Sequence, residues 1–187
     1  MTKPQIYVAK GKSPWYSNYW DNCHVINIDG HVSGKATVTC DGNITSTNLM
    51  FAVCRDLTSI DLSSFDTSKV TTMGHMFEEC NDLTKLNLSN FDTSKVTNMG
   101  WLFNNCYNLT TLDLSSFDTS KVKYMWAMFW GCNNLTTIKG IIDMKSCKLY
   151  RDMFANCPKL KDVKIKNPPA DFESVSGLSV SQYTIVS

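Results

Sequence analysis

The chain has 187 residues, of which 43% are hydrophobic and 19% are charged, and its net charge is +1. This balance is typical of one globular domain or two small ones. The near-neutral charge and dispersed lysines argue against nucleic acid as a partner. No stretch approaches the roughly 18 consecutive apolar residues of a membrane span, and residues 1–20 lack the apolar core of a secretion signal. We therefore expect neither membrane insertion nor a signal peptide.

Residues 1–43 are expected to form an N-terminal arm followed by a β-hairpin cap, because two Asp-Gly turns separate alternating apolar residues after position 25. The arm is rich in aromatic residues, which would either dock onto a partner or fold over the first coil. They are Trp15, Tyr16, Tyr19 and Trp20. Cys23 and Cys40 also lie in this region, where they would form a disulfide in an oxidising compartment or remain free thiols otherwise.

The middle of the chain is built from a repeat. The text "FDTSKV" begins at Phe65, Phe91 and Phe117, always 26 residues apart, within the longer pattern F-x-x-C-x-x-L-x-x-L-x-L-x-x-F-D-T-S-K-V-x-x-M. A fixed period of this length indicates a solenoid, in which each coil buries its apolar side only by stacking on its neighbours. The sequence therefore predicts a solenoid of about five 25–26-residue coils over residues 44–166.

Each coil is predicted to contain a short strand and a helical return, which places the fold in the α/β class. Leu86 and Leu88 alternate with polar residues, so stacked copies would form a parallel sheet. In the stretch "NMGWLFNNC" (98–106), apolar residues and the cysteine recur at i, i+3, i+4 and i+7, which predicts a short helix or 3₁₀ turn capped by Asn98. Residues 167–187 break the period at Pro168 and Pro169 and are expected to form a C-terminal cap of loop and strand.

Five of the eight cysteines belong to the repeat rather than to a disulfide framework. They are Cys54, Cys80, Cys106, Cys132 and Cys157. No paired C-x-x-C ligands accompany them, so we expect a column of buried thiols and neither a metal site nor another cofactor. The three histidines, at positions 24, 31 and 75, lack the text of any known catalytic motif. No catalytic residue is proposed, and the protein is not expected to be an enzyme.

The residues that interrupt the repeat carry the functional hypothesis, because large aromatic side chains replace polar or small residues in two adjacent coils. They are Trp101, Tyr107, Tyr124, Trp126 and Trp130. Tryptophan and tyrosine offer rigid apolar faces with polar tips, which suit protein interfaces and sugar rings. We expect a single aromatic binding patch. The alternatives are contact with another copy of the chain or a neighbouring domain, or rings that merely widen the core.

The repeat text, "LxxLxLSxFDTSxVxxMxxMFxxC", resembles that of the BspA-type leucine-rich repeat proteins and the related bacterial surface-lipoprotein repeats over residues 44–165. The resemblance implies a curved leucine-rich-repeat solenoid that acts in adhesion and recognition, mostly on bacterial surfaces and in some parasite and phage proteins. It favours a non-enzymatic module that binds a host-cell protein or a glycan at a bacterial surface. The alternative is a structural or host-recognition protein on the surface of a phage particle, docked to a virion protein through the N-terminal arm. A homo-oligomer is compatible with either hypothesis.

Overall fold

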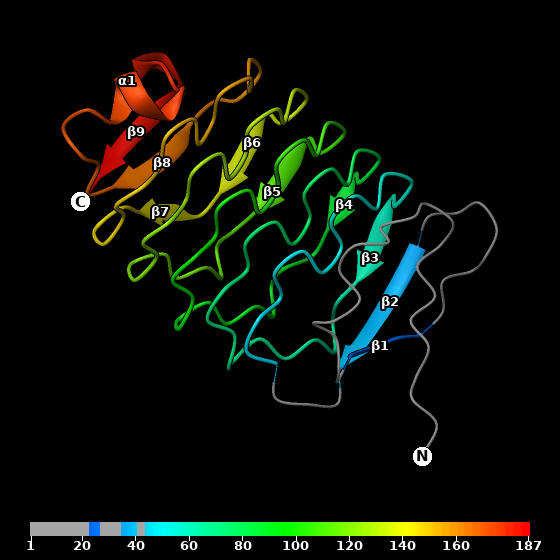
Figure 1. Cartoon of the computed structure of the whole chain (residues 1–187). Helices are drawn as coiled ribbons and strands as arrows, with labels where there is room; N and C mark the ends of the chain where they lie inside the picture. The colour runs from blue at the N-terminus through cyan, green and yellow to red at the C-terminus, as the bar shows by residue number, and fades with distance from the viewer. Residues whose placement is uncertain (1–22, 27–34, 41–43) are drawn as a thin grey trace.

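The computed structural model describes the backbone of residues 23–26 and 35–40 and the whole of residues 44–187. The chain is a β-solenoid of about six turns, with coils of roughly 23–26 residues, little helix and stacked aromatic ladders. Successive coils lie side by side in chain order, so that short strands from different coils run next to one another along the molecule (Figure 1). The predicted solenoid is therefore confirmed. It has about six turns where about five coils were expected, and with so little helix it is a β-solenoid and does not belong to the predicted α/β class.

The strands are short because each coil contributes only one or two stretches of ladder hydrogen bonds. They are β1 (Cys23–Ile26), β2 (Lys35–Cys40), β3 (Ser59–Asp61), β4 (Lys85–Leu86), β5 (Thr111–Asp113), β6 (Thr137–Lys139), β7 (Ile141–Asp143), β8 (Val163–Lys166) and β9 (Tyr183–Val186). They form three sheets, in the orders β1-β2-β3-β4, β5-β6 and β7-β8-β9. All of these pairs are parallel except β1–β2, as stacking of like coils requires.

Two columns of phenylalanine rings run through the core. The first joins residues 51, 77, 103, 129 and 154, with centroids of adjacent rings 5.2–5.7 Å apart. The second joins the phenylalanines of the FDTSKV text, whose adjacent centroids lie 5.9 and 6.2 Å apart. Because every ring packs on its own copy in the next coil, the phenylalanine must recur with the period of the solenoid.

The threonine of FDTSKV joins each coil to the next through a buried pair of hydrogen bonds. Thr93 Oγ1 donates to the carbonyl oxygen of Asp118 at 3.1 Å and accepts from the Asp118 N–H at 2.8 Å. Thr67 makes the same two bonds with Asp92, at 3.1 and 2.8 Å. A hydroxyl both donates and accepts, so this one side chain satisfies two backbone groups that lie outside any strand.

The aspartate and lysine of FDTSKV shape the exposed corner of the coil. Asp92 Oδ1 accepts from the Ser94 N–H at 2.9 Å, a local turn in which the side chain replaces a backbone acceptor. Lys95 Nζ donates to the Ser68 carbonyl of the preceding coil at 2.9 Å. The text recurs because its phenylalanine and valine are buried, its threonine and lysine reach a neighbouring coil, and its aspartate forms the turn.

The return segments, the ten residues that end at each repeat cysteine, are successions of turns and contain no helix, so the helical prediction is wrong. The expected inward residues Met99, Leu102, Phe103 and Cys106 are all buried. However, the N–H groups alternate in direction along the backbone: those of residues 75, 77 and 79 donate to residues 100, 102 and 104 of the next coil, and those of 76, 78 and 80 close local turns. A helix would direct all of them along its own axis.

Two positions in every return segment have positive φ, which these turns require at their third residue. One column contains His75 (φ 60°), Trp101 (61°) and Ala127 (49°); the other contains Asn105 (58°) and Gly131 (74°). Glycine, asparagine and histidine are the residues found more often in this conformation, whereas a bulky tryptophan adopts it rarely. The stacked neighbours hold these residues in place against the local preference.

The two ends of the solenoid differ from its middle. At the N-terminal end, β1 pairs antiparallel with β2, and this register places Cys23 opposite Cys40. The side chains of both cysteines lie outside the described residues, so their bonding stays a prediction. At the C-terminal end, a short helix α1 (Phe172–Ser176) and a 3₁₀ turn (Val180–Gln182) precede β9, which pairs with β8. The helix was not predicted.

Candidate functional site

The five aromatic residues predicted to bind a partner lie on or beside the return segments. Four of them form two pairs, and the fifth belongs to neither pair. In the first group, the ring of Trp101 stacks on His75 with centroids 5.5 Å apart and meets Trp126 edge-on at 5.6 Å. Trp126 is 39% exposed. Its indole lies over Gly100 of the preceding coil, where an added Cβ would fall 2.2 Å from Trp126 Nε1. Glycine is therefore needed beneath this ring.

The second group contains Tyr107 and Trp130, which line a hollow at the C-terminal end of the return segments. The hollow has a volume of about 440 Å³. Its lining comes from three coils and from the C-terminal cap: Asn105, Tyr107, Trp130, Gly131, Asn133, Asn156, Cys157, Pro158, Gly177 and Gln182. The cap contributes Gly177 and Gln182, which were not among the predicted site residues because they lie beyond the end of the repeat.

Tyr124 is the residue that stands apart. It lies in a ladder of isolated parallel bridges between Asn98 and Leu149, and its side chain is 42% exposed. The segment that holds Trp126 and Trp130 is a succession of turns rather than a helix, and these two residues belong to different groups. Trp126 instead contacts Trp101, while Trp130 lines the hollow with Tyr107.

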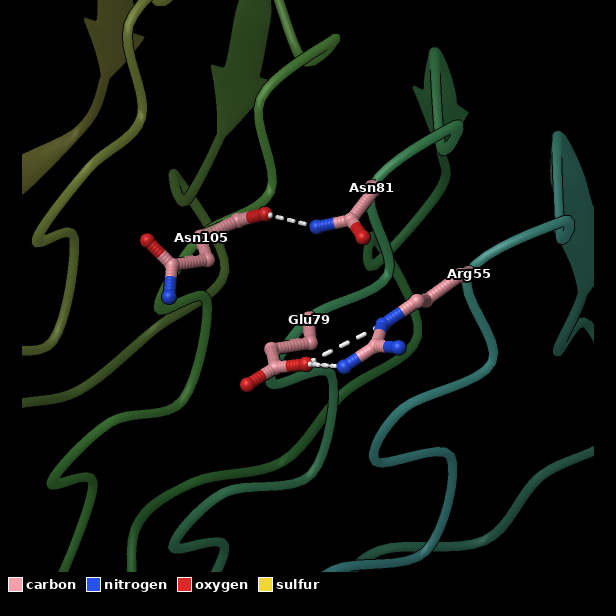
Figure 2. Close-up of polar contacts among 4 residues, drawn as sticks. All are labelled: Arg55, Glu79, Asn81 and Asn105. Atoms are coloured by element: carbon pink, nitrogen blue, oxygen red, sulfur yellow. Dashed lines mark hydrogen bonds and ion pairs between the residues drawn. The ribbon is translucent and has the colours of Figure 1, made fainter. Parts of the chain in front are cut away.

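Polar contacts tie the earlier coils together on the same side of the molecule. Figure 2 shows Arg55, whose Nε lies 3.1 Å from Glu79 Oε2 in the next coil and whose Nη2 also contacts that oxygen. The hydrogen bond from this guanidinium to Glu79 raises the pKa of Arg55. In the same view, Asn81 Nδ2 donates to the backbone carbonyl of Asn105 at 2.9 Å. Each bond links one coil to the next, which aligns the turns that carry the aromatic residues.

The return segment that contains Trp101 also holds buried polar atoms. Asn104 is 0% exposed, and neither atom of its amide has a hydrogen-bond partner within the described residues. Trp101 Nε1 is also buried without a partner there. Because its column holds Glu78 and Trp130 in the adjacent coils, Asn104 looks in the sequence like one more surface polar residue. Only the packed structure identifies it as buried.

The cysteine column is structural. The thiol of Cys106 donates to the Phe77 carbonyl of the preceding coil at 3.1 Å, and that of Cys132 donates to the Phe103 carbonyl at 3.1 Å. Burial raises the pKa of both thiols well above the usual value and that of Cys157 to about 12. A raised pKa lowers the thiolate fraction at neutral pH, so these groups are poor nucleophiles.

Two further findings concern the described residues alone. Their His, Cys, Asp and Glu side chains form no group of three that could hold a metal ion. None of their helices has the length and apolar character needed to cross a membrane. Trp15, Tyr16, Tyr19 and Trp20 of the predicted docking arm lie outside the described residues, so their role stays a prediction.

The fold and its repeated ladders define a solenoid repeat domain. Comparison with protein families identifies the particular one: residues 45–167 match the family described as "Mycoplasma protein of unknown function, DUF285". This match covers more than half of the chain, which therefore belongs to that family. Searches of curated proteins and of solved structures found no match.

Proposed function

We propose that the protein is a non-enzymatic recognition module that binds a protein or glycan partner through the aromatic residues that lie on or beside its return segments. Trp126 is the observation that carries this proposal. It occupies a position where Gly74 and Gly100 serve the two preceding coils, so the solenoid does not need a large ring there. An indole exposed to 39% at such a position contributes more to a binding surface than to the core.

The neighbouring aromatic residues support the same reading. Trp101 occupies a column whose next member is Ala127, and Trp130 one that holds Ala52 and Ala155. In both columns another coil holds alanine, so the fold does not require a tryptophan at either position. The resemblance of the repeat to BspA-type proteins agrees with recognition at a bacterial cell surface or on a phage particle, and we extend the proposal to such an exposed location.

The test is a binding screen against glycans and candidate surface or virion proteins, run with the whole chain and with a variant carrying Trp101→Ala, Trp126→Gly and Trp130→Ala. Each substitution reproduces a residue that the repeat already uses at that position, so the variant is expected to fold. Circular dichroism and the unfolding midpoint check this. Binding lost in a folded variant supports the proposal, and binding retained in full contradicts it.

A further inference from the structure

The hollow beside Tyr107 and Trp130 differs from the rest of the aromatic surface because it is concave and uncharged. Its volume of about 440 Å³ lies within the range of roughly 300–1,000 Å³ found for small-molecule sites. Trp101 and Trp126, in contrast, pack against each other on the outer surface. A concave site accepts a compact group, whereas a protein partner would need a broad surface.

The polar groups of the hollow are amides. Asn105, Asn133 and Asn156 line it, and the buried Oδ1 of Asn105 has no hydrogen-bond partner within the described part of the chain. An amide carries both donors and an acceptor, so three of them can meet a ligand that also donates and accepts. Gln182 is different, because its Nε2 already donates to the Leu160 carbonyl at 3.1 Å. The Gln182 side chain is therefore held in position at the edge of the hollow.

Asn105 is held in place by its neighbours. An added Cβ at Gly131 would lie 2.3 Å from Asn105 Oδ1, so the glycine in the next coil leaves room for this amide in its present position. The Asn105 carbonyl accepts from Asn81 at 2.9 Å (Figure 2). Asn105 Oδ1 itself is buried and has no partner within the described residues. A buried acceptor is rarely left without a hydrogen-bond partner in a folded protein.

No Asp, Glu, Lys or Arg of the described chain contributes to the lining. A carboxylate, phosphate or ammonium ligand would therefore lose its hydration without gaining an opposite charge, which is costly. An entirely apolar ligand would leave the amides unpaired. The ligand that matches both requirements is neutral, with hydroxyl groups on its edges and a C–H face that packs on an aromatic ring.

We propose that this hollow is the subsite for one neutral sugar residue of a glycan, stacked on Tyr107 and hydrogen-bonded by the asparagine amides. This inference rests on the proposed recognition function and names the ligand class at one part of its surface. Tyr107 is 42% exposed, so a large part of the residue is open to solvent. A ring in such a position can provide the apolar half of the contact while Asn133, itself exposed, provides hydrogen bonds.

The test uses immobilised neutral oligosaccharides, with sialylated and uronic-acid oligosaccharides as charged counterparts, and the surface or virion proteins of the first screen as a separate arm. The chain is expected to bind neutral members in preference to charged ones. Tyr107→Ala should weaken this binding by about tenfold or more, and Asn133→Asp should weaken it as well, because it removes a donor and adds a charge.

Ile141→Ala is the control, since Ile141 is a large exposed apolar residue (46%) on β7 that lies outside the hollow and is not one of the proposed aromatic residues. It should leave sugar binding unchanged. Sugar binding that survives Tyr107→Ala, or that is equally reduced by Ile141→Ala, overturns the assignment to the hollow. Binding of proteins without any neutral sugar overturns the sugar subsite and leaves the recognition function standing. Failure to bind any glycan or protein overturns both.

Discussion

The two sides of each coil follow opposite rules. At the FDTSKV corner the residues are tied to their neighbours: Phe91 stacks on its copies, Thr93 bonds the backbone of the next coil, and Lys95 reaches the one before. The half-buried serine also takes part, because its N–H donates to the aspartate of the turn. On the return segments the backbone hydrogen bonds repeat just as strictly, yet the side chains at the outer positions change from coil to coil. Residues that contact their own copies must recur, and those that do not are free to vary. The variable positions are therefore the candidates for a functional role.

The largest loss of stability is expected when a ring is removed from the middle of a phenylalanine column. Phe103 is fully buried and stacks on Phe77 and Phe129, both at 5.7 Å. We expect Phe103→Ala to lower the free energy of unfolding by about 3–5 kcal/mol, since it leaves a cavity at the centre of the stack. Urea denaturation measures this.

Phe154, at the C-terminal end of the same ladder, stacks within the described residues on one phenylalanine of that ladder, Phe129, with centroids 5.2 Å apart. Phe154→Ala should therefore cost less than Phe103→Ala. Equal losses would mean that the coils do not act as stacked neighbours with separate interfaces.

The repeat could be predicted from the sequence because its period reflects contacts between identical residues in successive coils. The return segments misled for a physical reason: a succession of turns places residues 99, 102, 103 and 106 inward just as a helix does. What separates the two backbones is the bond from alternate N–H groups to the next coil, which no local pattern encodes. A weak signal existed in the column of Asn105, Gly131 and Asn156, since asparagine and glycine favour positive φ.

The candidate site was predictable only in part. Aromatic residues that interrupt the repeat stand out in the sequence, but their grouping depends on distances across coils, such as that between Trp101 and Trp126. Gln182 and Gly177 join the hollow through the C-terminal cap, where the period has already ended. Asn104 was hidden for a further reason: a polar side chain without a partner is not expected in a core.

A smaller effect is expected from the buried threonines. In Thr93→Val the shape is kept but the hydroxyl is lost, which leaves the Asp118 N–H and carbonyl without their partner. The unfolding free energy should fall by about 1–3 kcal/mol.

Thr84→Val is the matched control, because Thr84 Oγ1 donates to the Thr58 carbonyl at 3.2 Å from an exposed position where water can replace it. The control should change stability little. If both variants lose the same amount, the buried pair of bonds is not what distinguishes the FDTSKV corner.

The acidic turn of the corner predicts a pH dependence. The Ser120 hydroxyl and N–H both donate to Asp118 Oδ1, at 2.6 and 2.9 Å, and these bonds lower the pKa of Asp118. A lowered pKa in the folded state favours the charged form, so Asp118 stabilises the fold above its unfolded pKa, and this contribution is lost as the pH falls through the folded pKa. Asp118→Asn keeps the acceptor but removes the titration.

Melting temperatures of the two proteins should therefore differ at neutral pH and converge on acidification. Asp56→Asn serves as a control, since Asp56 is an exposed aspartate that lies outside the FDTSKV corner. Curves for Asp118→Asn that stay parallel to the wild type down to the acid limit would contradict the assigned role of the turn.

The smallest effect on stability is expected at Trp126, on the variable side of the coil. Trp126→Gly restores the residue found at positions 74 and 100, and it removes a ring that packs on Trp101 and covers Gly100 from an exposed position. Its unfolding free energy should lie within about 1 kcal/mol of the wild type, as for most surface substitutions. A loss as large as that of Phe103→Ala would place Trp126 among the core residues and remove the reason for assigning it to recognition. A small loss combined with reduced partner binding would separate the two sides of the coil directly, because a ring that does little for the fold would then be required only by the partner.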